Sequence, residues 1–154
     1  MNEKTKVLIT GITGMLGYDV AKEFLNNNKY ALYGIARNIQ NQKLFDEKLK
    51  IKSLDLTNFT KTKRTIKKIN PDIIIHCAAN VNLKRCENNK RMAYSINSEV
   101  PKQLAGYQPK KTKLIYISSD SVFNGTTGDY SEKDPTNPVN IYAKSKLRGE
   151  KNVL

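Results

Sequence analysis

Three glycines that directly follow the first apolar segment place the strongest constraint on the fold of this chain. Residues 6–10 form a short apolar run, and residues 11–17 continue it without a gap as Gly-Ile-Thr-Gly-Met-Leu-Gly. In such a strand–turn–helix pattern, Gly11 allows the tight turn, Gly14 lets the backbone approach a bound group, and Gly17 lets the helix pack close to the strand. The alternative is that the glycines serve close packing alone.

The loop between this strand and the next helix predicts a binding site for the pyrophosphate of a dinucleotide. Free backbone N–H groups and the helix dipole favour negative charge at the start of a helix. Three glycines alone would be a weak motif, and the order of strand, turn and helix around them strengthens it. The loop residues that we expect at the cofactor are Gly11, Thr13, Gly14, Met15, Leu16 and Gly17.

Short apolar runs alternate with longer mixed segments along the rest of the chain. The predicted strands are Lys6–Thr10, Tyr30–Ile35, Lys50–Leu54, Asp72–His76 and Lys113–Ser118. The predicted helices are Met15–Asn26, Phe59–Ile69, Asn89–Ala105 and Ile141–Val153. This alternation is typical of an α/β fold of the Rossmann type, a doubly wound parallel sheet with helices on both faces. We therefore expect residues 1–154 to form one nucleotide-binding domain.

Local signals refine three of these segments. Asn58 or Thr57 is the expected N-cap of the second predicted helix. Pro101 should interrupt or kink the helix predicted over residues 89–105, because proline has no backbone N–H. Residues 124–140 are rich in Gly, Pro, Thr, Asn and Asp, which predicts a long surface loop. Loops of this length in compact domains are often functional.

The end of the second predicted strand indicates which dinucleotide binds. Sites specific for NAD usually carry Asp or Glu there, which accepts a hydrogen bond from the ribose 2′-hydroxyl. Residues 34–38 of this chain read Gly-Ile-Ala-Arg-Asn and contain no acid. The guanidinium of Arg37 can bind a 2′-phosphate through a bidentate fork. We therefore predict NADP(H) ahead of NAD(H), the alternative being an exposed Arg37 without a role in binding.

Asp55 and Leu56 follow the third predicted strand and lie at the same edge of the sheet. A carboxylate at this position can accept a hydrogen bond from the adenine amino group, with Leu56 against the ring. We expect both residues to contact the cofactor. The alternative is that Asp55 caps the N-terminus of the next helix.

A tyrosine and a lysine four residues apart supply candidate chemistry. Tyr142 and Lys146 lie on one face of the last predicted helix. A free tyrosine has a pKa of about 10, and a nearby ammonium or a positive nicotinamide ring favours the phenolate. The pair therefore predicts proton transfer at a substrate, and Lys146 can also hold the nicotinamide ribose. The alternative is a surface pair of little energetic consequence.

The fifth predicted strand brings a hydroxyl group to the same edge. It ends at Ser118, Ser119 and Asp120, at the carboxyl end of a parallel strand, where ligands bind in such sheets. A hydroxyl there can hydrogen-bond a substrate carbonyl oxygen while hydride arrives at the carbon. Ser119 is the predicted third member of the site, and Ser118 is the alternative.

Composition argues against several other classes of protein. The net charge of +13 comes from lysines scattered among many asparagines, with no basic stripe interleaved with aromatic residues, so we do not expect nucleic acid as a partner. No apolar run reaches about 18 residues, and no signal-peptide core is evident, so we expect a cytoplasmic location without a membrane partner. Cys77 and Cys86, with His76 as the single histidine, fit neither a disulfide framework nor a zinc site. We expect free thiols and no metal.

Four segments in a fixed order reveal a family resemblance. They are residues 11–17, residues 75–80 (Ile-His-Cys-Ala-Ala-Asn), residues 117–125 (Ile-Ser-Ser-Asp-Ser-Val-Phe-Asn-Gly) and residues 138–150 (Pro-Val-Asn-Ile-Tyr-Ala-Lys-Ser-Lys-Leu-Arg-Gly-Glu). With them the chain resembles the extended short-chain dehydrogenases/reductases. It is most similar to dTDP-4-dehydrorhamnose reductase and its relatives, which include the regulatory β subunit of methionine adenosyltransferase.

The resemblance implies roles for individual residues. Ser119 takes the place of the catalytic Ser/Thr, Tyr142 that of the acid and Lys146 that of its partner. Asn97 matches an asparagine that shapes the helix beside the site, the alternative being an ordinary residue of the helix surface. The loop expected beneath the cofactor consists of Cys77, Ala78 and Ala79. The implied reaction is NADPH-dependent reduction of a nucleotide-linked 4-keto-6-deoxy sugar, as used in deoxysugar and cell-surface polysaccharide biosynthesis. Hydride goes to C4, and Tyr142 gives a proton to the oxygen.

The chain departs from the family at two positions and in length. Relatives usually carry Tyr where this chain has Ser121 and Asp where it has Lys84, which leaves the sugar open. They also continue for about as many residues again, including a small substrate domain. The resemblance therefore implies a domain without its C-terminal substrate part. We expect a nucleotide sugar as the ligand and a homodimer formed through exposed sheet edges.

Two other functions remain as alternatives. One is a non-catalytic dinucleotide-binding module that regulates a partner, as the adenosyltransferase β subunit does. The other is a nucleotide-sugar epimerase or dehydratase. An epimerase would favour an acid after the second strand, where this chain has Arg37. A dehydratase would need a second acid/base group beside Asp120, and no Glu follows it.

Overall fold

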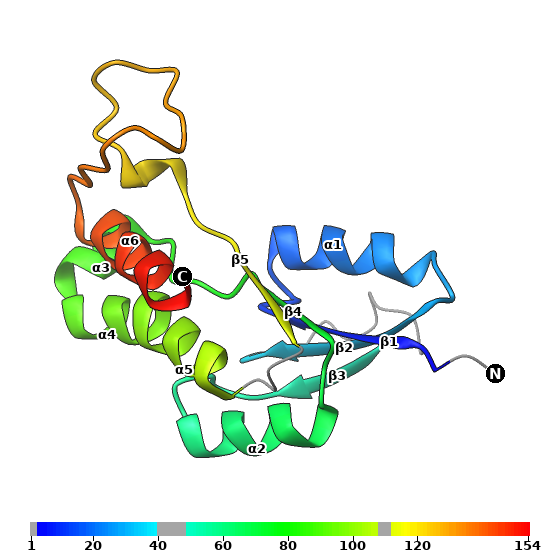
Figure 1. The fold of residues 1–154 in the computed structure, drawn as a ribbon. Coiled ribbons are helices and arrows are strands. Elements are labelled where there is room, and N and C mark those ends of the chain that lie inside the picture. The colour runs from blue at the N-terminus through cyan, green and yellow to red at the C-terminus, as the bar shows by residue number, and fades with distance from the viewer. Residues whose placement is uncertain (1–2, 40–48, 108–111) are drawn as a thin grey trace.

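Five parallel strands with helices on both faces make up the fold, in a computed structural model that describes residues 3–39, 49–107 and 112–154 (Figure 1). The strands are β1 (Thr5–Thr10), β2 (Tyr30–Ala36), β3 (Lys50–Ser53), β4 (Ile73–His76) and β5 (Lys113–Tyr116). The α-helices are α1 (Met15–Leu25), α2 (Phe59–Ile69), α3 (Leu83–Asn88), α4 (Lys90–Tyr94), α5 (Val100–Tyr107) and α6 (Ile141–Val153). A π-helix, η2 (Ser95–Glu99), joins α4 to α5, and a 3-10 turn, η3 (Asp120–Val122), follows β5.

The strand order is β3-β2-β1-β4-β5, and every neighbouring pair is parallel. In register, Val7 of β1 lies between Leu32 of β2 and Ile73 of β4. The chain moves outward from β1 in one direction through β2 and β3, and in the other through β4 and β5. This reversal leaves a crevice at the carboxyl ends of β1 and β4, where doubly wound sheets bind ligands. The predicted doubly wound fold is confirmed.

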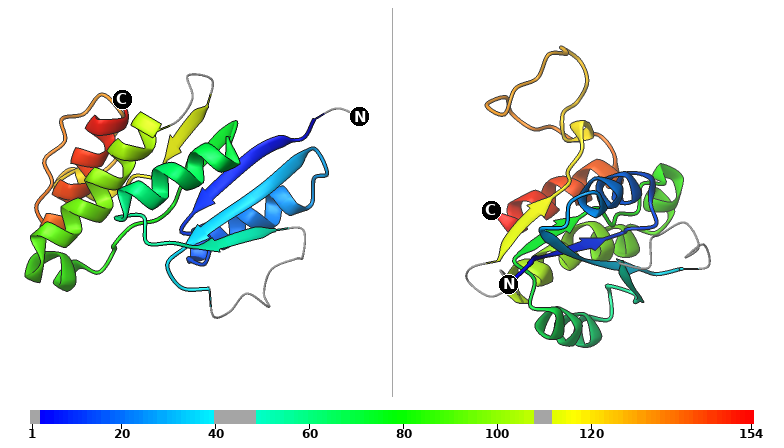
Figure 2. Two further views of the ribbon diagram at one scale, coloured as in Figure 1. Left: turned by 90° about the horizontal axis from the view of Figure 1, so that it is seen from below. Right: turned by 90° about the vertical axis from the view of Figure 1, so that its right-hand side faces the viewer.

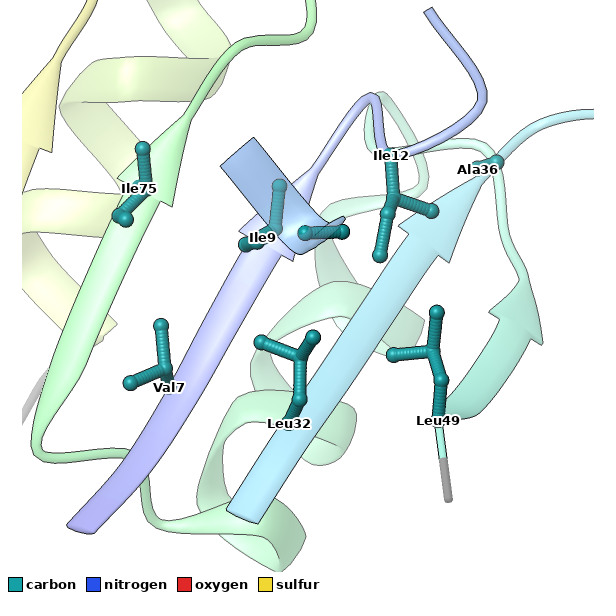
Figure 3. Packing of buried hydrophobic residues seen from close by; sticks show 8 residues of the cluster. Val7, Ile9, Ile12, Leu32, Ala36, Leu49 and Ile75 are labelled. Carbon is teal, nitrogen blue, oxygen red and sulfur yellow. The ribbon is translucent and has the colours of Figure 1, made fainter. Parts of the chain in front are cut away.

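The buried residues form one cluster on each face of the sheet. Alternation along β1 sends Val7 and Ile9 to one face and Leu8 to the other, all three fully buried. Figure 3 shows the first cluster, which comprises Val7, Ile9, Ile12, Ala21, Leu32, Ala36, Leu49 and Ile75. The second comprises Leu8, Ile35, Leu54, Ile66, Ile74, Val100 and Leu104. Helix α1 covers the first face, and α2 and α5 cover the second (Figure 2).

Asparagine side chains fix the start of four helices. Asn58 caps α2 by accepting from the N–H of Lys61 at 3.1 Å, which confirms the predicted cap and excludes Thr57. Asn82, Asn89 and Asn140 cap α3, α4 and α6 in the same way. Among the helices of the described residues, none combines the length and the apolar character that a membrane crossing requires.

The helix predicted over residues 89–105 differs from the observed structure. The chain forms α4, then the π-helical turn η2, then α5, and the distortion lies before Pro101 instead of at it. Pro101 is the second residue of α5, and it has no N–H to donate to the carbonyl of Asn97, four residues earlier. Helix α3 was not predicted, because its six residues are too few to show an apolar period. Residues 124–140 contain no helix or strand, as predicted.

Candidate active site

A groove of about 280 Å³ lies at the carboxyl edge of the sheet, over the reversal of strand order. Nine of the residues predicted to contact the cofactor line it: Gly11, Thr13, Gly14, Arg37, Asp55, Leu56, Cys77, Ala78 and Ala79. These residues come from the ends of β1, β2, β3 and β4, so segments far apart in the sequence share one surface. Met92, Ile96 and Val100 add an apolar wall from the helical side, which the sequence did not predict.

The glycine loop has the geometry that the sequence predicts. Gly11 has a φ of +70°, and a Cβ there would lie 2.7 Å from the backbone of Ala78. A Cβ on Gly17 would overlap the carbonyl oxygen of Gly11, so α1 approaches the loop only because this residue is glycine. Met15 and Leu16 are 88% and 46% exposed and lie outside the groove lining, so their predicted cofactor contact stays a prediction.

Arg37 and Asp55 lie at the end of the groove formed by β2 and β3. The carboxylate of Asp55 accepts from the backbone N–H and the hydroxyl of Thr57, at 2.9 and 2.7 Å. These bonds lower the pKa of Asp55, and the positive charge of Arg37 lowers it further, so the group is an anion at neutral pH. The alternative that Asp55 caps α2 is wrong, because Asn58 is the cap.

Lys146 is buried, with 3% of its surface exposed, at the centre of α6. Its ammonium donates to the carbonyl oxygen of Ile117 at 2.5 Å and lies 4.1 Å from the centre of the Tyr116 ring. Burial lowers the pKa of Lys146 to about 8, and the negative charge of Glu150 partly opposes this shift. The alternative of a solvent-exposed surface pair is wrong for Lys146.

Tyr142 lies on the same helix as this lysine, and Ser119 follows Ile117, whose carbonyl oxygen accepts from the lysine. Tyr142 is half-buried and precedes Lys146 by one turn of α6, as the spacing predicts. Ser119 is also half-buried; its hydroxyl donates to Asp120 at 3.3 Å and accepts from the N–H of Ser121 at 3.2 Å. The turn η3, which directly follows Ser119, packs against α6. Ser118, the alternative, has a buried hydroxyl without a hydrogen-bond partner among the described residues.

Asn97 connects the π-helix to the groove loop and to α6. Its amide accepts from the N–H of Asn80 at 2.8 Å and donates to the Asn80 carbonyl at 3.1 Å and to the Ser145 hydroxyl at 3.0 Å. Only 1% of its surface is exposed, so the alternative of an ordinary surface residue is wrong. Through these bonds Asn97 holds the loop after β4 in a fixed position relative to the helix that bears Tyr142.

His76 is a further residue of this region that the sequence reasoning did not place in the site. It is fully buried at the end of β4, with its Nδ1 2.6 Å from the hydroxyl of Thr10 and its ring stacked on Tyr116. Burial lowers the pKa of His76 to about 3, so the ring is neutral. Its Nε2, the Asn80 side-chain nitrogen and the Ser118 hydroxyl are buried polar atoms without partners among the described residues. His76 ends β4, and Asn80 and Ser118 lie in the segments that follow β4 and β5.

The two cysteines differ in their surroundings. Cys77 and Cys86 are both free thiols, as expected, and Cys77 lines the groove. Burial raises the pKa of Cys77, which leaves it a neutral thiol at neutral pH. Within residues 3–39, 49–107 and 112–154, no cluster of His, Cys, Asp and Glu has the size to hold a metal ion.

The parallel sheet, the glycine loop and the groove over the strand reversal define a doubly wound α/β domain of the Rossmann type. Residues 5–154 match the family described as the RmlD substrate binding domain, and the chain belongs to this family. The resemblance noted in the sequence is thereby confirmed.

Individual relatives fall into two groups. The chain is 39% identical over 151 residues to methionine adenosyltransferase 2 subunit beta of Bos taurus, which covers 97% of this chain and 42% of that protein. It is 30% identical over 151 residues to dTDP-4-dehydrorhamnose reductase of Aggregatibacter actinomycetemcomitans, covering 97% of this chain and 47% of the relative. The chain thus spans less than half the length of these relatives.

The fold of this chain is also similar to that of a solved structure. The dTDP-4-dehydrorhamnose reductase of Bacillus anthracis, in complex with NADP, superimposes with a TM-score of 0.77 at 32% sequence identity. The match covers 99% of this chain and 50% of that one. The similarity therefore extends over the described sheet and its helices.

Proposed function

We propose that this chain is the NADP(H)-binding and proton-transferring part of a reductase that acts on nucleotide-linked 4-keto-6-deoxy sugars. The observation that carries the proposal is the buried Lys146 ammonium, held one helical turn from Tyr142 by the carbonyl oxygen of Ile117, just after β5. Burying a charged lysine lowers the stability of the folded chain, and groups with shifted pKa values are concentrated at functional sites.

The groove fits a dinucleotide in its lining and its charge. Gly11 and Gly14 leave room for a pyrophosphate at the start of α1, and the loop beneath it is formed by small side chains at Ala78 and Ala79. Asp55 and Leu56 are placed for adenine, and the exposed guanidinium of Arg37 for a 2′-phosphate. The Bacillus anthracis relative was crystallised with NADP, which supports NADP(H) in this proposal.

Tyr142, Lys146 and Ser119 each have a separate role in the proposed carbonyl reduction. Bound NADPH would supply the hydride that reaches the carbonyl carbon. Tyr142 then gives its phenolic proton to the carbonyl oxygen, and the Lys146 ammonium stabilises the phenolate that remains. The hydroxyl of Ser119 hydrogen-bonds the same oxygen as negative charge develops on it. In the structure this hydroxyl donates to Asp120, so its proton must turn away from that carboxylate to reach the substrate oxygen.

The identity of the sugar depends on residues near the outer end of this site. Ser121 is half-buried in η3 beside Ser119, and Lys84 is exposed on α3. Both replace residues that are usual in the family, and both lie on elements that pack against α6. A nucleotide sugar with a 4-keto group is the substrate class that we propose, and a homodimer is the proposed assembly.

A regulatory module is the second candidate. Identity of 36–39% to the adenosyltransferase β subunits exceeds the 30% to the Aggregatibacter actinomycetemcomitans reductase, which favours it. In that case the chain would bind NADP(H) and act on a partner without turnover. Intact Ser119, Tyr142 and Lys146 favour the reductase.

The test is NADPH oxidation in the presence of a dTDP-4-keto-6-deoxy sugar, measured for the chain and for the whole protein that contains it. Turnover that disappears in Tyr142→Phe supports the reductase. NADPH binding without turnover in either form, together with a partner that co-purifies, supports the regulatory module. Absence of NADPH binding overturns both.

A further inference from the structure

Tyr116, the last residue of β5, contacts the buried lysine through the face of its ring. The Lys146 ammonium lies 4.1 Å from the ring centre, well within the range of a cation–π interaction. The ring also stacks on His76, with centres 5.8 Å apart and planes at 21°. Because His76 is neutral, it stabilises the ring without adding a second cation.

The hydroxyl of the same tyrosine connects two other elements. It lies 3.0 Å from the carbonyl oxygen of Asn97 in η2 and 3.2 Å from the carbonyl oxygen of Lys146 in α6, and it can donate to either. One side chain on the sheet therefore contacts the backbone of both helices that meet beside the groove.

The π-helical turn explains why the Asn97 carbonyl is available. In a regular α-helix this oxygen would accept from the N–H of residue 101, which is a proline and has none. Within the turn, the N–H of Val100 donates to Ser95, five residues earlier. Tyr116 supplies the missing donor from outside the helix.

Gly149 makes this arrangement sterically allowed. A Cβ on Gly149 would overlap both the Asn97 carbonyl oxygen and the Tyr116 hydroxyl. The helix that bears Lys146 therefore lies against the π-turn and the tyrosine at a distance that only glycine permits. Tyr116 and Gly149 therefore meet at the Asn97 carbonyl oxygen, which Pro101 leaves without its regular donor.

We propose that Tyr116 is a positioning residue for Lys146: its ring face carries the ammonium, and its hydroxyl holds α6 against η2. The inference rests on the proposed function only where it assigns the Lys146 ammonium a role in stabilising the Tyr142 phenolate. The contact itself belongs to the chain without cofactor or substrate.

The surroundings of the ammonium explain why the ring matters. Its one hydrogen-bond acceptor among the described residues is the Ile117 carbonyl, and no carboxylate there lies within salt-bridge distance. Glu150 and Cys77 act on the lysine only as more distant negative or ionisable groups. Tyr142 precedes it on the same helix. The Tyr116 ring is therefore one of two direct stabilising contacts.

The role of the ring is tested by reversing the electrostatic potential of its face while keeping its size nearly the same. Phenylalanine and pentafluorophenylalanine at position 116 are compared in the full chain, with ¹³C-labelled lysine observed by NMR and Lys146→Met used to assign the signal. The Lys146 pKa is expected to be about 0.5–1 pH unit lower with the fluorinated ring than with Phe. Equal values in the two variants would overturn the role of the ring. The same pair of substitutions at Tyr33, another strand tyrosine beside a lysine, should leave the Lys146 signal unchanged.

The hydroxyl is tested by hydrogen exchange in Tyr116→Phe. Loss of the donor to Asn97 and Lys146 is expected to raise amide exchange about fivefold or more over residues 97–102 and 146–150, with α2 unaffected. Unchanged exchange in both segments would overturn the role of the hydroxyl. Neither measurement requires turnover, so a chain that fails as a reductase still decides the proposal. If the reductase is active, kcat should fall in Tyr116→Phe with KM nearly unchanged.

Discussion

The carboxylate of Glu87 accepts a hydrogen bond from the backbone N–H of Ile141 at 2.8 Å, across 54 positions of the sequence. Ile141 is the first residue of α6, and Asn140 before it accepts from the N–H of Ala143. Two of the free N–H groups at the start of this helix are thus satisfied, one locally and one from α3. A negative charge also complements the helix dipole at this end. Glu87 and Asn140 thus both hold the start of the helix that carries Tyr142.

Replacement of Glu87 should loosen the start of α6. For Glu87→Ala we expect the free energy of unfolding to fall by about 1–2 kcal/mol, because a charge-assisted bond and a favourable dipole interaction are lost. Glu87→Gln keeps an acceptor and should lose about half as much. Urea denaturation measures both. Equal stability of the alanine variant and the unaltered chain would show that Asn140 alone fixes the helix.

Two glycine-to-alanine changes should act in opposite directions. Gly17→Ala places a methyl group onto the Gly11 carbonyl, so we expect a loss of about 2–4 kcal/mol and weaker NADPH binding as the loop moves. Gly106→Ala in α5 meets no atom within 4 Å and should add about 0.5–1 kcal/mol through helix propensity. Thermal unfolding and NADPH fluorescence titration distinguish the two. A Gly17→Ala variant that binds normally would contradict the close helix–loop contact.

The Asn97 amide should be difficult to replace. Asn97→Ala removes three hydrogen bonds and leaves both backbone groups of Asn80 without these partners, so we expect a loss of about 2–4 kcal/mol. Asn97→Asp keeps the bond from the Asn80 N–H but sets a carboxylate against the Asn80 carbonyl, so it should not restore stability. Asn82→Ala, which removes the cap of exposed α3, is the matched control and should cost about 1 kcal/mol. Similar losses in the two alanine variants would contradict the connecting role of Asn97.

The strands and the glycine loop were predictable because their signals are local. Each strand is a short apolar run, and the glycines follow the first of them directly, so the doubly wound parallel sheet and the glycine loop could be predicted from the sequence. The end of the second helix at Ile69 was also correct. These features depend on neighbours in the chain, which the sequence displays.

The connections behind the lysine were not predictable in the same way. Tyr116 appeared in the sequence as a strand residue, and Gly149 as a helix residue with low propensity. Their relation arises only when the sheet, the π-turn and α6 meet in space. The displaced distortion before Pro101 has the same origin, because the tyrosine hydroxyl satisfies the carbonyl that the proline leaves free. Pro101 within a predicted helix was the one feature of the sequence that indicated a carbonyl in need of another donor.

Cofactor preference should depend on Arg37. Arg37→Ser removes the cation proposed for the 2′-phosphate, so we expect the Kd for NADPH to rise about 10- to 100-fold, with little change for NADH. Fluorescence titration with both cofactors measures the ratio. Arg64→Ser, which removes an exposed arginine of α2 outside the groove lining, should change neither value. Parallel weakening of NADPH and NADH in Arg37→Ser would contradict a contact with the 2′-phosphate.

The buried ammonium should leave a signature in the pH dependence of stability. The pKa of Lys146 is about 8 in the folded chain and 10.5 for an ordinary lysine, because burial disfavours the charged form. Between these values the unfolded chain binds the proton more tightly, so this group's contribution to stability rises with pH from about 8 to 10.5 and is lost as pH falls through 8. Below pH 8 the folded chain carries the full cost of a buried cation.

Lys146→Met isolates this contribution, since all other titrating groups are common to both chains. The free energy of unfolding of the variant minus that of the unaltered chain should be about 3 kcal/mol larger at pH 7 than at pH 10.5, as the two pKa values require. Urea denaturation at intervals between these pH values measures the difference. A gap that stays constant across the range would mean that Lys146 titrates like a solvent-exposed lysine, and the buried site described for it would then be wrong.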